Sequence, residues 1–386
     1  MTPAAELLQR WLLTDGRAVA SVPDLLEQVS LALRRHAPVD RVGIGTRVLH
    51  PQAAAHRWIH EHGRPLVNRE LSYAVFARMR QGDSAARRLE GGAPVVCFHP
   101  GDTGLPEETI ALWSRGYTEL YGLSLFLRGR WAGAVTWATR SPGGFSAAHR
   151  GLFDDIMPAL SAVIEPLAQE LVMATLLRTY LGQDAGARVH SGAVKRGDGT
   201  TTQAVVWFSQ VRGFTRLSTQ LGRDALLGLL NDQFEVVVQA VEAQGGQVLK
   251  FMGDGLLAVF PQTAGDPTGG DVCRAARSAA EELKARLRAL RTRRQAAGLE
   301  VVDIRVGLHF GEVSYGNIGA PARLDFTVIG PAVNLAAQVE SMCGRLGEDA
   351  LATADFVRRG GGSWESRGEH VMKGLSTSVE VFALGV

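Results

Sequence analysis

Two apolar runs around Gly253-Asp254-Gly255 constrain the fold of this chain more than any other feature. The runs extend over 247–260, and the glycine-rich triplet between them is typical of a β-hairpin with a tight turn. An apolar, β-branched run at 203–209 predicts a buried strand upstream. The amphipathic segment 224–243 between that strand and the hairpin predicts a helix.

Further patterned segments continue this order along the second half of the chain. They are a helix over 272–295, a strand over 301–313, a helix over 333–343, and short strands near Leu351 and over 379–384. The order β-α-β-β-α-β predicts an α+β fold of the ferredoxin-like kind, with an antiparallel sheet covered by helices on one side.

The first half of the chain has a different organisation. Residues 123–138 predict two strands around an Arg-Gly-Arg turn, and Ser146 is a predicted N-cap of the helix that follows. This order resembles the C-terminal half of GAF sensor domains, an α/β sandwich, over approximately Asp40–Leu160. The resemblance implies either a small-ligand site, whose ligand these residues do not identify, or a dimerising spacer.

We therefore predict three parts: a GAF-like sensor and dimerisation domain (1–175), a signalling helix with a polar linker (176–200), and a second domain (201–386). Apolar residues three and four apart between Phe153 and Ala174 predict either a dimerising coiled-coil seam or a single helix packed on its own domain.

Composition restricts the function classes. The 386 residues are 46% hydrophobic and 21% charged, which is ordinary for a globular protein. A net charge of +2 argues against nucleic acid or an anionic membrane as the main partner. We see no signal peptide and expect no membrane span, which predicts a cytoplasmic protein. Cys97, Cys273 and Cys343 lack metal-ligand spacing and are expected to be free thiols.

The predicted layout places polar residues where phosphate chemistry is feasible. The strand end at Gln210 and the hairpin tip at Asp254 should lie side by side, where two carboxylates would hold Mg²⁺ against a triphosphate. The backbone of Gly213, Phe214 and Thr215 leads into a helix, so its N–H groups are suited to phosphate oxygens. Asn334 and residue 338 are four apart and share one helix face.

These residues resemble those of class III nucleotidyl cyclases, over about Thr201–Val386. The matching pieces are Phe208-Ser-Gln-Val-Arg-Gly-Phe-Thr215, Lys250-Phe-Met-Gly-Asp254, Leu324-Asp-Phe-Thr-Val-Ile-Gly330, Val333-Asn-Leu-Ala-Ala337 and Met372-Lys-Gly374. The resemblance implies head-to-tail pairing of two such domains, with each site shared between the two chains.

The resemblance also implies a role for each matching residue. Asp254 corresponds to a metal aspartate for Mg²⁺ or Mn²⁺, and Asn334 to the ribose ligand. Lys250 and Asp325 correspond to the adenine-selecting pair, and Lys373 to a phosphate-binding lysine.

Two positions depart from the family pattern. Gln210 stands where the first metal aspartate belongs, and Gln338 where the transition-state arginine belongs. Removing one preorganised donor to a developing oxyanion costs about 10²–10³ in rate.

The hypothesis that follows is an adenylate cyclase-like homodimer that binds ATP or another adenine nucleotide and cyclises it weakly or not at all. Two alternatives remain open: an active adenylate cyclase with a rearranged metal site, and a non-catalytic dimeric scaffold.

Overall fold

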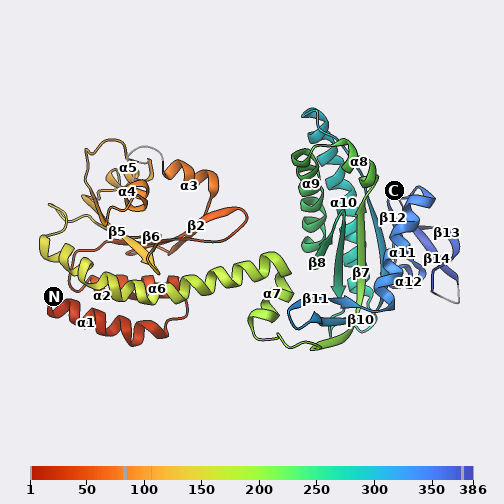
Figure 1. Ribbon diagram of the computed structural model, residues 1–386, viewed down its shortest axis with the longest axis horizontal. Helices are drawn as coiled ribbons and strands as arrows, with labels where there is room; N and C mark the ends of the chain where they lie inside the picture. The colour runs from red at the N-terminus through yellow and green to blue at the C-terminus, as the bar shows by residue number, and fades with distance from the viewer. Residues whose placement is uncertain (1, 81–84, 106, 375–377, 386) are drawn as a thin grey trace. The chain divides into compact units, whose positions relative to one another are not determined.

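The computed structural model describes residues 2–80, 85–105, 107–374 and 378–385, and divides the chain into two compact units (Figure 1). The first unit is Met1–Thr179 and the second is Tyr180–Val386. The boundary lies within the segment 176–200 that we predicted as a linker, so most of that segment packs with the second unit.

The first unit is built on a six-stranded antiparallel sheet in the order β3-β2-β1-β6-β5-β4. Its strands are β1 (Arg41–Arg47), β2 (Ala53–Glu61), β3 (Val67–Ser72), β4 (Val95–Phe98), β5 (Glu119–Leu127) and β6 (Arg130–Thr139).

Helices cover both faces of this sheet (Figure 1). On one face lie α1 (Pro3–Leu13), α2 (Val22–Leu33) and α6 (Ala147–Leu181), with a short 3₁₀ turn at Asp15–Ala18. On the other lie α3 (Tyr73–Met79), α4 (Ala85–Glu90) and α5 (Glu107–Trp113). The two strands that we predicted around the Arg-Gly-Arg turn are present as β5 and β6. The GAF resemblance itself stays a prediction.

Helix α6 is continuous through Pro158 and Pro166. The predicted Ser146 cap is present, since the Ser146 hydroxyl accepts a hydrogen bond from the N–H of His149 at 3.2 Å. The apolar seam of α6 is used within its own unit, because its first four members are buried in that core: Phe153, Ile156, Leu160 and Ile164. The seam up to Ile164 is therefore not free for a second chain.

Helix α6 is long and apolar enough to cross a membrane by length and composition alone, with a mean hydropathy of 1.4 in its most apolar window. Of that window, 22% is buried inside the structure. The absence of a membrane span stays a prediction.

The second unit has an eight-stranded sheet in the order β13-β14-β12-β10-β7-β9-β8, with β11 paired to β10. Its strands are β7 (Gly199–Val211), β8 (Gln247–Met252), β9 (Gly255–Pro261), β10 (Ile304–Ala320), β11 (Arg323–Ile329), β12 (Ala350–Thr353), β13 (Trp364–Val371) and β14 (Ser378–Leu384). Its helices are α7 (Gln183–His190), α8 (Phe214–Gln220), α9 (Arg223–Ala243), α10 (Gly270–Ala296), α11 (Pro331–Leu346) and α12 (Ala354–Gly360).

The ferredoxin-like core of this unit is β10-β7-β9-β8 with α9 and α10 on one face. The predicted α+β fold is confirmed. Strands β11 and β13 were not predicted. Strand β13 is mostly exposed and lacks alternation between buried and exposed positions. Its sequence therefore has no hydrophobic periodicity that would predict a strand.

The residues after α6 are fixed to the second unit. Ala185 of α7 is buried against the sheet. The side-chain amide of Asn317, on β10, donates hydrogen bonds to the carbonyl oxygens of Ala193 at 2.9 Å and Lys195 at 3.3 Å. The stretch that we predicted as a linker is therefore a structural part of the second unit up to β7.

Gly307 allows β10 to lie directly against α11, the helix that carries Asn334 and Gln338. A Cβ at Gly307 would lie 2.4 Å from the Glu340 backbone nitrogen and 2.5 Å from the Ala336 carbonyl oxygen. Because both neighbours are backbone atoms of a packed helix, α11 would have to move.

We expect Gly307→Ala to lower the free energy of unfolding by about 1–3 kcal/mol through overpacking, measured by urea titration. The matched control is Gly228→Ala on the exposed face of α9, where a Cβ would meet nothing within 4 Å. That control should stabilise by about 0.5–1 kcal/mol through better helix propensity. Equal effects of the two changes would contradict the close β10–α11 contact.

Candidate active site

The structure brings Gln210 and Asp254 together at one end of the sheet. Gln210 pairs with Gly255 across β7 and β9, and the Val211 N–H donates to the Asp254 carbonyl oxygen at 3.0 Å. The Gln210 side-chain amide donates to Asp254 Oδ1 at 3.2 Å. A neutral amide thus satisfies part of the Asp254 carboxylate.

An ion pair that we did not predict, between a half-buried arginine and a buried glutamate, lies beside these residues. Arg305 pairs with Gln210 across β10 and β7, and its Nε lies 3.1 Å from Oε1 of Glu340 on α11. Neither of these two atoms makes a well-aligned hydrogen bond. Burial raises the pKa of Glu340, Arg305 lowers it, and Asp254 raises it further, so the pKa lies above its usual value. The interaction with Asp254 puts Glu340 in the electrostatic field of the Gln210–Asp254 pair.

Lys250 and Asp325 form an ion pair although they are 75 residues apart in sequence. Lys250 Nζ lies 2.9 Å from Asp325 Oδ2, joining β8 to β11. Their side chains are 32% and 54% exposed, so the pair adds little to stability. Both groups are open to solvent and to a ligand.

The side-chain amide of Gln338 uses both its nitrogen and its oxygen to bind the main chain of one residue. Its Nε2 donates to the Lys373 carbonyl oxygen at 3.1 Å, and its Oε1 accepts from the Lys373 N–H at 2.6 Å. An arginine has no acceptor and could not reproduce the second bond. Gln338 therefore holds the main chain that carries Lys373 against α11.

The remaining predicted residues lie near Gln210 and Gln338 in the sequence. Asn334 is exposed in the first turn of α11, one turn before Gln338. Gly213 adopts a left-handed conformation with φ 72° and caps α8. Phe214 packs partly against the core and Thr215 is exposed.

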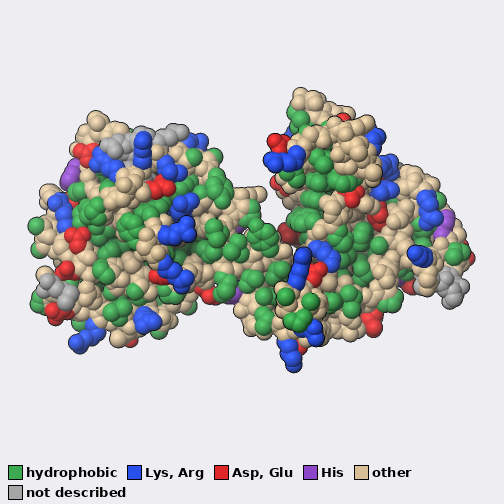
Figure 2. All heavy atoms as spheres, viewed as in Figure 1, with side chains coloured by type: hydrophobic (Ala, Val, Ile, Leu, Met, Phe, Trp, Pro, Cys, Tyr) green, Lys and Arg blue, Asp and Glu red, His purple; other side chains and the backbone are tan. Residues whose placement is uncertain are grey.

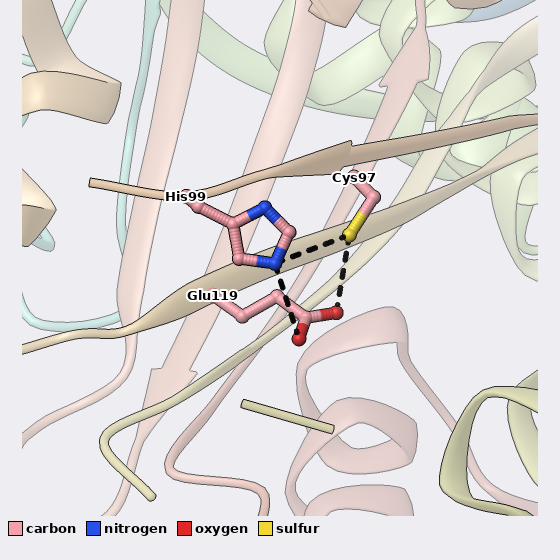
Figure 3. A group of neighbouring side chains, drawn as sticks. All are labelled: Cys97, His99 and Glu119. Atoms are coloured by element: carbon pink, nitrogen blue, oxygen red, sulfur yellow. Dashed lines mark hydrogen bonds and ion pairs between the residues drawn. The ribbon is translucent and has the colours of Figure 1, made fainter. Parts of the chain in front are cut away.

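Cys97, His99 and Glu119 form a separate cluster in the first unit that we did not predict (Figure 3). The Cys97 thiol donates to Glu119 Oε1 at 3.2 Å, and His99 Nε2 lies 3.6 Å from Glu119 Oε2. Arg150 binds both Glu119 oxygens at 3.0 and 2.9 Å, and the Phe145 N–H donates to Oε2 at 2.8 Å.

Glu119 is thus already neutralised. Burial alone would raise its pKa, but the bonds from Arg150 and Phe145 outweigh burial and lower it. Burial also raises the pKa of the Cys97 thiol to about 12. A buried carboxylate held by a guanidinium and a protonated thiol make a poor metal site. All three cysteines of the chain are free thiols, as expected.

Comparison with known proteins identifies the second unit. The family model described as the adenylate and guanylate cyclase catalytic domain matches residues 198–384. Residues 198–384 belong to the class III adenylate and guanylate cyclase family.

Two curated relatives of this cyclase domain are named as adenylate cyclases. Adenylate cyclase 1 of Rhizobium meliloti is 27% identical over 183 residues, which are 47% of this chain and 27% of that protein. The adenylate cyclase of Anabaena cylindrica is 29% identical over 169 residues, which are 43% of this chain and 32% of that protein. The chain therefore spans only a third or less of the length of these relatives.

A longer match and a solved structure extend the comparison. An uncharacterized protein of Mycobacterium tuberculosis is 26% identical over 331 residues, covering 73% of this chain and 59% of that protein. The structure of a bacterial light-regulated adenylyl cyclase covers 69% of this chain and 86% of its own, with a TM-score of 0.50 and 20% identity. At that identity the likeness shows the fold alone.

The Gln210–Asp254 contact of the cyclase domain predicts the effect of an aspartate introduced at position 210. Gln210→Asp replaces a donor by a second carboxylate next to Asp254. Without metal, we expect the lost hydrogen bond and the like-charge repulsion to lower the free energy of unfolding by about 1–2 kcal/mol. Mn²⁺ should reverse this loss and raise the melting temperature of the variant more than that of the wild type.

The control is Gln210→Asp combined with Asp254→Asn, which has one carboxylate again. It should lose the extra response to Mn²⁺ measured by thermal unfolding in EDTA and in excess Mn²⁺. An equal Mn²⁺ response in wild type and Gln210→Asp would contradict a metal site at this place.

Proposed function

We propose that this chain is an adenylate cyclase-like signalling protein whose cyclase domain binds an adenine nucleotide and cyclises it weakly or not at all. One observation carries the proposal: the Lys250–Asp325 pair is assembled and solvent-accessible, whereas Gln210 occupies the position beside Asp254. The adenylate cyclases among the relatives support adenine as the base.

The Lys250–Asp325 pair suits adenine chemically. A lysine ammonium donates to a ring nitrogen, and an aspartate carboxylate accepts from the exocyclic amine. The two side chains lie within 2.9 Å of each other and are partly exposed, so a base can contact both at once. Asn334 would contact the ribose, and Lys373 the phosphates.

The two glutamines support weak or absent cyclisation. Gln210 has an amide oxygen that can ligate Mg²⁺ or Mn²⁺, but the site has one negative charge fewer facing a divalent ion. Gln338 is neutral and its amide is engaged with the Lys373 main chain. It supplies no cation for charge that develops on the reacting phosphate.

We propose a homodimer as the binding form, with each site shared between two chains. Figure 2 shows hydrophobic side chains gathered on the viewed face of the second unit, over β7 and β8. Exposed apolar residues of the second unit include Phe251 on β8, Ile329 on β11 and Leu227 on α9. A second copy would remove these apolar surfaces from water.

Pairing with an intact cyclase chain would not complete a site. One of the two shared sites would still contain Gln338, and the other would still contain Gln210. This chain has altered one residue of each half-site, so we infer that no partner restores full activity.

We propose that the first unit is a GAF-like sensor for a small ligand. The support is its antiparallel sheet order β3-β2-β1-β6-β5-β4 with helices on both faces. The free thiols of the chain agree with the proposed cytoplasmic location, where thiols stay reduced.

Nucleotide binding can be tested by titrating ATP with Mn²⁺ into the full chain in a calorimeter. We expect a measurable dissociation constant below a few millimolar, and Lys250→Ala or Asp325→Ala should weaken it about 10-fold through loss of a charge-assisted hydrogen bond. Lys195→Ala, which removes an exposed lysine in the loop before β7, should change nothing. Absence of ATP binding to the wild type would refute the proposal and leave the scaffold alternative.

Cyclisation can be tested by mass spectrometry of products from ATP and GTP with Mg²⁺ or Mn²⁺. We expect little or no cyclic AMP from the wild type, and a gain of about 10²–10³-fold in Gln210→Asp/Gln338→Arg. Adding Asp254→Asn should abolish the gain. Rapid cyclic AMP formation by the wild type would establish the other alternative, an active cyclase with a rearranged metal site.

A further inference from the structure

A pocket lies between the sheet of the first unit and helices α3, α4 and α5. Its floor is hollowed because small residues, among them Gly43, Gly45 and Ala134, occupy neighbouring positions of β1 and β6. Large apolar side chains form its walls: Phe76, Met79, Leu89, Leu112 and Trp131. A ligand whose main part is apolar or aromatic would fit against these walls.

Arg41, at the start of β1, lines this pocket and is only 5% exposed. Among the residues that the structure describes, its guanidinium has no hydrogen-bond or ion-pair partner. The nearest acid, Glu61, faces it across β1 and β2 but is bound by Arg115 and Arg140. A buried cation without an acceptor is costly unless a ligand supplies one.

Arg41 stays charged despite its burial. Desolvation, and then the neighbouring Arg57, lower its pKa to about 10, which still leaves it protonated at neutral pH. The indole N–H of Trp131, also in the lining, is buried and has no hydrogen-bond acceptor among the described residues. Two unused donors therefore border one largely apolar pocket.

The charged side chains of the described lining carry a net positive charge. Among the lining residues that the structure describes, Arg41, Arg47 and Arg57 stand beside one carboxylate, that of Glu108. Glu108 is bound to Arg57, with Oε2 2.5 Å from Nη1. An anion that entered the pocket would meet Arg41 without having to displace a protein carboxylate.

We propose that this pocket binds a small organic acid, with its apolar or aromatic body between the sheet and α3–α5 and its anionic group paired with Arg41. A planar carboxylate accepts two hydrogen bonds from a guanidinium, which gives both affinity and orientation. The inference rests on the sensor role proposed above and names the class of ligand that the sensor takes.

The test is calorimetry on the full chain with benzoate, 3-phenylpropionate and indole-3-acetate, each beside its neutral amide. At least one acid should bind, and about 10-fold or more tightly than its amide, because only the acid supplies a charge for Arg41. The tryptophan fluorescence of the chain, to which Trp131 contributes, should change with the same acid. Arg41→Met should weaken that acid about 10- to 100-fold, whereas Arg130→Met, an exposed arginine on the same unit, should not.

Stability of the unliganded protein separates a binding role from a folding role. Removing an unpaired buried charge should leave the melting temperature of Arg41→Met at or above that of the wild type. An Arg41→Met protein that unfolds at lower temperature would show that Arg41 is needed for folding, and the inference would fail.

The remaining outcomes distinguish this inference from the proposals on which it rests. Equal binding of acids and amides would keep a sensor pocket but refute the anionic ligand. If none of the acids binds at about 10 mM, a concentration well within the range of weak specific binding, the inference is refuted. ATP titration of the same sample then shows whether the proposed nucleotide site still binds its ligand.

Discussion

The second unit depends on the pairing of β7 with β10 on one side and β9 on the other. Strand β7 is central, and its side chains are buried on both faces: Val205 and Trp207 in the core under α9 and α10, Ala204 and Val206 on the opposite face. A one-residue shift would exchange these two sets. The register therefore has little freedom, and it places Gln210 between Arg305 and Gly255.

That register also determines which charged groups surround Gln210. The half-buried Arg305 and the buried Glu340 lie beside it, and Asp254 completes a group of two acids and one base around a neutral amide. Gln210 contributes a donor to Asp254 where an aspartate would contribute repulsion. The glutamine is thus compatible with a site that holds no metal, which is the physical link between the fold and the proposed loss of cyclisation.

Gln338 differs from Gln210 in what it contacts. Its amide matches the backbone N–H and C=O of one residue, Lys373, so it connects α11 to the chain near β14. An arginine at 338 would gain charge and lose this connection. Position 338 can therefore contribute to the proposed nucleotide pocket through the placement of Lys373, independently of any catalytic cation.

Much of the fold was predictable because its periodicities are local. The hairpin at 247–260, the helices that became α9 and α10, and the ferredoxin-like order rest on neighbouring residues. Strand β11 was missed although polar and apolar residues alternate over 323–328, a pattern typical of a strand. Strand β13 was missed because it is mostly exposed. The pairing of Lys250 with Asp325 was predicted only through the family resemblance, since nothing local connects residues so far apart in the chain.

The sequence by itself determined which residue types stand at the key positions: an aspartate at 254, and neutral amides at 210 and 338. It also determined the order of strands and helices, because hydrophobic period is a local property. Only the tertiary structure decided which groups are already satisfied. Glu119 is held by Arg150 and Gln338 by Lys373, whereas Arg41 has no acceptor among the described residues. These outcomes depend on residues that meet only when the chain is packed.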